Sequence, residues 1–179
     1  HQMWEFVEGV RGVADACHAI TLKDNPNDPT PIIAGNVSFY NESKNGPIPP
    51  SPIVSCLGRF KDVNKAVPAH FQNNDSVILL IGERKNELGG SVYYSLKNEL
   101  GANVPKPNFE EVRNQIFALT DCIDSGLVLS CHDIADGGIA SALAEMTFRN
   151  SIGCNVNIES DLSPDKILLL TFTNKAANE

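Results

Sequence analysis

Residues 130–139 read Ser-Cys-His-Asp-Ile-Ala-Asp-Gly-Gly-Ile, and this stretch decides the fold that the sequence predicts. The apolar segment Leu127–Cys131 predicts a buried strand that ends inside it. Gly137 and Gly138 then open a predicted helix that continues to about Phe148. A strand that leads directly into a helix is typical of a mixed sheet covered by helices. The sequence therefore predicts an α/β or α+β class.

Three other segments have the 3.6-residue periodicity of amphipathic helices. They are Met3–Ala19, about Val92–Leu100, and a longer segment that starts after Asn108 and ends at Gly126. Asn108 is a predicted N-cap, because an Asn followed three residues later by Glu111 suits the start of a helix.

Apolar or extended segments predict strands elsewhere in the chain. Ser76–Gly82 is continuously apolar at its centre, which indicates burial on both faces of a sheet. Asn25–Pro31 is predicted to be a loop, and Asn45-Gly46 a turn. The remaining predicted strands are Pro31–Ala34, Val37–Tyr40, Ile53–Phe60, Cys154–Ile158 and Ile167–Phe172.

Lys61–Asn74 is polar and has no clear period, so it predicts a domain boundary. We expect one domain over residues 1–62, a linker over 63–75 and a second domain over 76–179. The chain opens at His1 in helical pattern, which favours a fragment of a longer protein. An uncovered strand edge in such a fragment would allow a homodimer.

The composition limits the classes of function. A net charge of −8 and a pI of about 4.9 argue against a nucleic-acid binder, which needs clustered Lys and Arg. No apolar run is long enough to predict a membrane span. The five cysteines have no paired or metal-ligand spacing, so we expect reduced thiols in a cytoplasmic protein.

A first candidate site follows the predicted strand Pro31–Ala34. Gly35 permits close approach of a ligand, and Asn36 offers an amide oxygen to a hard cation such as Mg²⁺. Ser38 offers a hydroxyl to a substrate, and Glu42 offers a carboxylate. From spacing alone, a half-exposed strand whose polar side chains serve a turn explains the same residues.

A second candidate site is the junction quoted above. A helix that starts at Gly137 and Gly138 exposes backbone N–H groups toward an anion. His132 beside Asp133 and Asp136 is a candidate proton carrier. The alternative is structural: one of the two aspartates caps the helix and His132 forms a local hydrogen bond.

A third stretch, Gly89-Gly90-Ser91, also precedes a predicted helix. It suits a phosphate site, but a turn at the start of a helix explains it more simply. The sequence contains no phosphate-binding loop of the GxxxxGK[ST] type, no zinc-type Cys/His spacing and no GxSxG nucleophile turn.

Taken together, these motifs resemble the phosphoribosylformylglycinamidine synthase family. The stretch Pro31–Glu42, with the proline-rich Ile48–Pro52 after it, is similar to the family's GNVSxYNE signature. Glu87–Ser91 and His132–Ile139 resemble its LGGSE and HDxSDGGL motifs in the same order. Related forms of the last motif occur across the aminoimidazole ribonucleotide synthetase superfamily.

The resemblance implies the end of an ATP-binding A domain, followed by an incomplete C-terminal domain of the aminoimidazole ribonucleotide synthetase type. It implies that Gly35 binds ATP, Asn36 binds Mg²⁺ and Ser38 binds substrate. The implied reaction converts formylglycinamide ribonucleotide, ATP and ammonia from a glutaminase to the amidine, ADP and phosphate. The resemblance assigns no catalytic residue to this chain, so we expect no activity from it alone.

Three positions depart from the family pattern, and each lacks a polar side chain: Ala34, Val92 and Ala135. Two alternatives remain open at this point. The chain can belong to another member of the superfamily, such as selenophosphate synthetase or a small-molecule kinase. It can also be a non-catalytic half that holds an auxiliary nucleotide.

Overall fold

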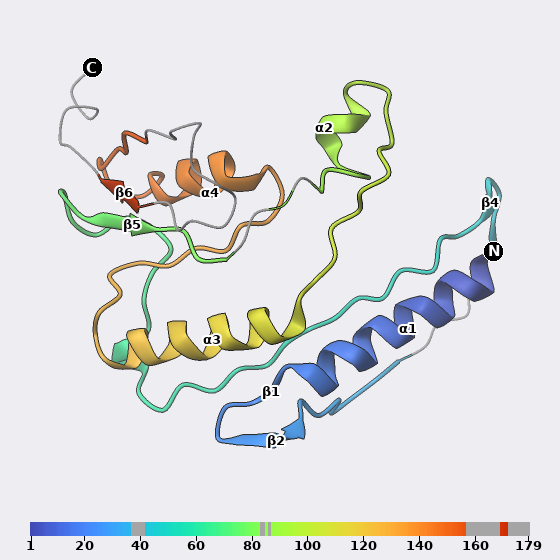
Figure 1. Cartoon of the computed structure of the whole chain (residues 1–179), viewed down its shortest axis with the longest axis horizontal. Helices are drawn as coiled ribbons and strands as arrows, with labels where there is room; N and C mark the ends of the chain where they lie inside the picture. The colour runs from blue at the N-terminus through green and yellow to red at the C-terminus, as the bar shows by residue number, and fades with distance from the viewer. Residues whose placement is uncertain (37–41, 83–84, 86, 157–168, 172–179) are drawn as a thin grey trace. The chain divides into compact units, whose positions relative to one another are not determined.

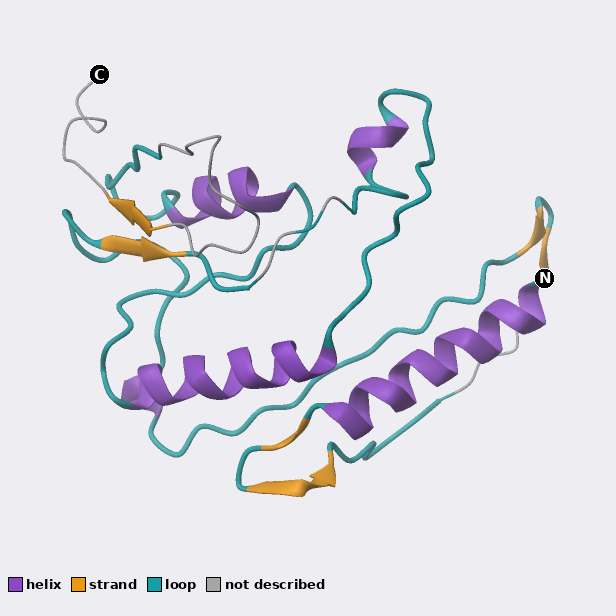
Figure 2. Ribbon diagram, viewed as in Figure 1, coloured by secondary structure: helices purple, strands orange, loops and turns teal. Residues whose placement is uncertain are grey.

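The protein combines helices with small antiparallel sheets (Figures 1 and 2). The structure, a computed structural model, describes residues 1–36, 42–82, 85, 87–156 and 169–171. The chain divides into two units. One comprises His1–Arg59 and Asn108–Phe117, and the other comprises Phe60–Pro107 and Ala118–Glu179. The predicted division into domains at about residue 62 stays a prediction.

The first unit begins with α1, Gln2–Ala19, which confirms the predicted first helix (Figure 1). The helix ends where the Ile20 N–H donates to the Ala16 carbonyl at 2.8 Å. The strand β1, Thr21–Leu22, then pairs antiparallel with β2, Asn25–Pro29. The prediction of a loop over Asn25–Pro31 was therefore wrong for most of its length. Strand pairing uses backbone hydrogen bonds, which polar residues can also form, so this polar segment becomes a strand beside β1.

A hairpin follows in the same unit, formed by β3, Glu42–Ser43, and β4, Gly46–Pro47. Ser43 pairs with Gly46, so Lys44 and Asn45 form the two-residue turn. The predicted turn at Asn45-Gly46 is thus confirmed to within one residue.

Two strands predicted in the first unit are absent from the described residues. Pro31–Ala34 and Ile53–Phe60 both lack regular secondary structure and are unpaired. Their apolar side chains lie in solvent: Ile33 is 76% exposed and Ile53 96%. A strand needs a partner as well as apolar residues, and these segments have none in the described part of the chain. The predicted strand Val37–Tyr40 lies outside the described residues.

The second unit contains the 3₁₀ turn η1, Val63–Lys65, and the strand β5, Val77–Leu79. β5 pairs antiparallel with β6, Leu169–Thr171. This confirms the centres of the predicted strands Ser76–Gly82 and Ile167–Phe172. The predicted burial of β5 on both faces was wrong, because Val77 is 55% exposed and Leu79 61%.

Helix α2, Val92–Ser95, is shorter than predicted. Helix α3, Phe109–Asp124, agrees well with prediction. The Asn108 side chain accepts a hydrogen bond from the Glu111 N–H at 3.2 Å, which confirms the predicted N-cap. After α3 the chain turns at Gly126, whose N–H donates to the Ile123 carbonyl.

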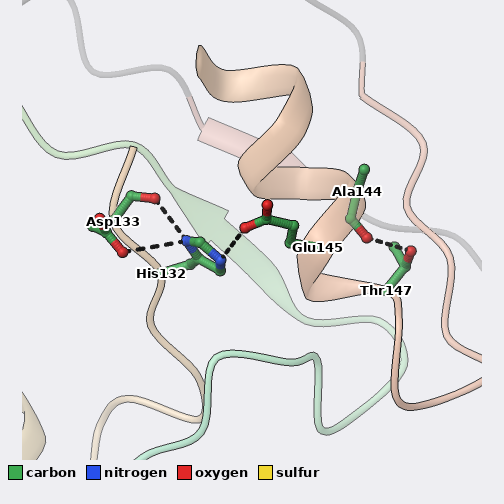
Figure 3. A network of polar contacts seen from close by, with 5 residues as sticks. All are labelled: His132, Asp133, Ala144, Glu145 and Thr147. Carbon is green, nitrogen blue, oxygen red and sulfur yellow. Dashed lines mark hydrogen bonds and ion pairs between the residues drawn. The ribbon is translucent and has the colours of Figure 1, made fainter. Parts of the chain in front are cut away.

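Helix α4, Gly138–Met146, confirms the helix predicted after the glycine pair. Figures 1 and 3 both draw it beside β5. The buried apolar side chains of the described residues all lie in this unit: Phe71, Leu80, Ala142 and Met146. The Phe71 N–H donates to the Met146 carbonyl at 2.9 Å, so the segment before β5 is tied to the end of α4.

Two predicted strands of the second unit do not form as expected. Leu127–Cys131 is irregular, and Leu127 is 74% exposed. The described part of Cys154–Ile158, which ends at residue 156, is also not a strand. Among the described residues the sheets are three separate two-stranded antiparallel pairs, so the predicted mixed sheet does not form there. The coarser prediction, helices together with strands, is confirmed.

Candidate functional site

The first candidate site lies in the first unit. Gly35 and Asn36 are exposed and follow a segment without regular secondary structure. No described atom lies within 4 Å of the position that a Cβ on Gly35 would take, so a ligand has room to approach the backbone. Glu42 is exposed at the start of β3. Ser38 lies outside the described residues.

These residues fit part of a Mg²⁺ site. Mg²⁺ prefers six oxygen ligands, several of them waters, and takes one or two from protein side chains. The exposed amide of Asn36 and carboxylate of Glu42 are ligands of the right chemistry. No cluster of three or more His, Cys, Asp or Glu that can hold a metal occurs among the described residues. The described residues of this unit therefore offer a cation single ligands rather than a complete cage.

The second candidate site is built around the start of α4. Gly137 is the N-cap residue and adopts the left-handed region, at φ 84°. A Cβ at this position would lie 1.9 Å from the Ser141 Oγ. Both facts require glycine here, because a side chain would be strained and would also clash. The Gly138 N–H donates to the Ala135 carbonyl at 3.1 Å, which closes the turn.

The position of Ala135 also explains why a polar side chain is dispensable there. Its contribution to the turn comes from the backbone carbonyl. The predicted cap by Asp133 or Asp136 was wrong, since α4 has no side-chain cap and both aspartates are exposed. The geometry of the helix start therefore depends on the two glycines.

His132 lies just before this turn (Figure 3), and 16% of its side chain is exposed, less than at the other described candidate polar residues. Its Nδ1 lies 2.6 Å from the Asp133 backbone carbonyl, and its Nε2 lies 2.8 Å from Oε2 of Glu145. The Asp133 carboxylate is 3.6 Å from Nδ1 and is 88% exposed. Solvent screens such a contact, so it contributes little.

Glu145 is the functional candidate that the sequence analysis missed. It lies two helical turns after Gly138, so the two residues share one side of α4. That spacing is the signal that could have placed Glu145 near the loop before the helix. The separation of His132 from Glu145 along the chain hides the pairing from any motif.

Cys131 precedes His132, and its backbone N–H donates to the Pro68 carbonyl at 3.0 Å. Partial burial raises the pKa of the Cys131 thiol, and the nearby Asp133 carboxylate raises it further. Burial also raises the pKa of the Cys154 thiol. Both thiols are therefore poor nucleophiles at neutral pH. All five cysteines are free, as predicted.

The Gly89-Gly90-Ser91 stretch has a structural explanation. The Gly89 and Gly90 N–H groups donate to the carbonyls of Asn103 and Leu100 at 2.8 and 2.7 Å. A Cβ on Gly89 would lie 2.8 Å from the Asn103 backbone, so the two segments can meet only at a glycine. The Ser91 Oγ accepts a hydrogen bond from the Tyr94 N–H and caps α2. The stretch is therefore a turn at the start of a helix, the simpler of its two sequence-based explanations.

Comparison with known proteins shows the family of the chain. Residues 73–174, more than half of the chain, match the family model described as "AIR synthase related protein, C-terminal domain". The chain belongs to this family. The family segment contains α4, its glycine turn and the His132–Glu145 contact.

Similar curated proteins carry the name "Phosphoribosylformylglycinamidine synthase subunit PurL". The one from Methanothrix thermoacetophila is 42% identical over 168 residues, which cover 92% of this chain and 22% of the relative. The one from Thermobifida fusca is 38% identical over 161 residues, or 89% of this chain and 20% of the relative. The one from Thermoplasma volcanium is 39% identical over 156 residues, with shares of 87% and 19%.

These findings confirm the resemblance to the phosphoribosylformylglycinamidine synthase family. They also show that the chain spans about a fifth of the length of the curated relatives it matches. Within the described residues, no helix is long and apolar enough to cross a membrane.

Proposed function

We propose that this chain is part of an ATP-dependent carbon–nitrogen ligase of purine biosynthesis, a phosphoribosylformylglycinamidine synthase of the cytoplasm. The proposal rests on one observation above all. The chain is 42% identical to a synthase subunit over 92% of its own length, so both candidate sites lie in the region of similarity.

In the proposed reaction, ATP phosphorylates the formyl-amide oxygen of formylglycinamide ribonucleotide. Ammonia then adds to the same carbon, and phosphate leaves to give the amidine and ADP. The word "subunit" in the relatives' name supports a separate partner, which would release the ammonia from glutamine.

The proposed roles of the residues follow their chemistry. Gly35 lets a nucleotide approach the backbone, because no described atom fills the space beside it. Asn36 gives its amide oxygen to Mg²⁺, which arrives with the nucleotide and neutralises charge on its phosphates. Ser38 donates its hydroxyl to the substrate. Glu42 is a further candidate ligand of the same cation.

The direct test is a chimera. The matching segment of the Methanothrix relative is replaced by this chain, and formation of the amidine product is measured with ammonia as the nitrogen source. We expect turnover, and we expect Asn36→Ala to weaken the apparent affinity for Mg²⁺ by at least about tenfold. Asn114→Ala is the matched control, since Asn114 is exposed on α3.

Two results would contradict the proposal. A chimera that folds and binds nucleotide but makes no amidine would show that this chain cannot serve the ligase. Equal Mg²⁺ dependence of the Asn36→Ala and Asn114→Ala chimeras would remove Asn36 from the cation site. Nucleotide that stays bound through turnover without exchange would instead support a non-catalytic nucleotide at this half.

A further inference from the structure

The imidazole of His132 is held on both sides. Nδ1 lies 2.6 Å from the Asp133 backbone carbonyl and Nε2 lies 2.8 Å from Oε2 of Glu145 (Figure 3). Glu145 projects from α4, whereas His132 lies on the loop that leads into that helix. The contact therefore joins the loop to a helix turn that follows it in the chain.

The chemistry of the two acceptors determines where the protons are. A backbone carbonyl can only accept a hydrogen bond, so Nδ1 carries a proton. In a neutral ring with that proton, Nε2 has none and cannot donate to a carboxylate. The 2.8 Å contact therefore needs one more proton, either on Nε2 or on the Glu145 carboxyl. In both cases a single proton lies between the two side chains.

We propose that Glu145 is a positioning residue that fixes the orientation of His132, and that the proton shared by the pair holds the loop 132–137 against α4. The inference rests on the geometry of this unit alone and is independent of the proposed ligase activity. Since both ring nitrogens have hydrogen-bond partners, the role of His132 here is to hold the loop against α4. It is not a free proton carrier, which was one of the two roles that its sequence suggested.

The backbone supports this role. The loop is anchored before His132, where the Cys131 N–H donates to the Pro68 carbonyl, and after it, where the Gly138 N–H donates to the Ala135 carbonyl. Between these anchors, the described side-chain contact from the loop to α4 is the one between His132 and Glu145. The charged groups that contact the ring are Glu145 and, at 3.6 Å, the exposed Asp133.

The proposal is tested by nitrogen NMR of the full chain with ¹⁵N-labelled histidine. The chain has four histidines, so His132→Asn assigns the signals. In the unmodified chain we expect a proton on Nδ1 and proton-sharing character on Nε2. In Glu145→Gln we expect a neutral ring with only Nδ1 protonated, because the glutamine amide can donate to the bare Nε2. Glu99→Gln, at an exposed position of the same unit, is the control and should leave the ring signals unchanged.

Hydrogen exchange of the Gly138 amide gives a second measurement. Glu145→Ala should speed its exchange by about tenfold, the factor that corresponds to the loss of about 1.4 kcal/mol. Glu145→Gln should stay within about twofold of the unmodified chain, because the amide still bridges to the ring. Near-normal exchange in Glu145→Gln distinguishes a role in holding the loop from general loss of structure.

Two outcomes would overturn the proposal. One is a bare Nδ1 in the unmodified chain, which would contradict the proton assignment. The other is a Glu145→Ala chain that folds and keeps both the ring signals and the Gly138 exchange rate of the unmodified chain. If Glu145→Ala unfolds the chain, as far-ultraviolet circular dichroism would reveal, the Nδ1 proton of the unmodified chain and the Gly138 exchange rate of Glu145→Gln decide: a bare Nδ1, or exchange more than about twofold faster in Glu145→Gln, overturns the proposal.

Discussion

Replacing Gly137 by alanine should destabilise the second unit more than the same change at Gly138. Both residues have positive φ, 84° and 69°, so an alanine at either position incurs the cost of the left-handed region, about 1–2 kcal/mol. They differ in their surroundings. A Cβ on Gly137 would lie 1.9 Å from the Ser141 Oγ and 2.7 Å from its Cβ, whereas a Cβ on Gly138 meets no described atom within 4 Å.

The clash with Ser141 sets the size of the difference. The hydroxyl can rotate away, but the Ser141 Cβ is fixed to the helix, so the turn itself must move. Overpacking of this kind adds about 1–3 kcal/mol. We therefore expect Gly137→Ala to lower the free energy of unfolding by about 2–5 kcal/mol and Gly138→Ala by about 1–2 kcal/mol.

The assay is urea unfolding followed by circular dichroism, with a double-mutant cycle through Ser141→Gly. That single change removes the clashing atoms and costs at most about 1 kcal/mol in helix propensity. In its presence, the cost of Gly137→Ala should fall to that of Gly138→Ala. Equal costs for the two alanine variants in the unmodified background would refute the reasoning, because they would show that Ser141 does not crowd the turn.

Three further predictions use other parts of the chain. Asn108→Ala should destabilise by about 1 kcal/mol through loss of the α3 cap, while Asn114→Ala on the same helix should cost nothing measurable by urea unfolding. Gly12→Ala should stabilise by about 0.5–1 kcal/mol, since Gly12 is inside α1 and no described atom lies within 4 Å of the position that the new methyl group would take; a lower melting temperature would contradict this. Iodoacetamide at pH 8 should alkylate Cys131 and Cys154 more slowly than the exposed Cys56, because their raised pKa leaves less thiolate, and peptide mass spectrometry would show the order.

Helices α1, α3 and α4 could be predicted from the sequence because their information is local. Apolar spacing identifies α1 and α4, and for α3 the Asn108 cap adds the starting residue. Each signal lies within a few turns of the structure it determines, so no distant partner is needed.

The strands were predicted less well because a strand is stable only when another segment pairs with it. Ile53–Phe60 has the composition of a strand yet stays unpaired, while the polar Asn25–Pro29 becomes one beside Thr21–Leu22. The candidate site shows the same difference between local signals and contacts that the fold creates. The glycine turn was visible in the sequence, but the partner of His132 was not, because Glu145 is brought to it only by the fold.

The hydrogen bonds that close the loop at Gly89 have a practical consequence. Gly89 and Gly90 at one end donate to the carbonyls of Asn103 and Leu100 at the other end, so residues 89–103 form a self-contained surface loop. Asn98, inside this loop, is exposed. A fluorescent label at Asn98 would leave the hydrogen bond from Gly89 to Asn103 in place, which makes the loop a suitable attachment point for following this protein in larger assemblies.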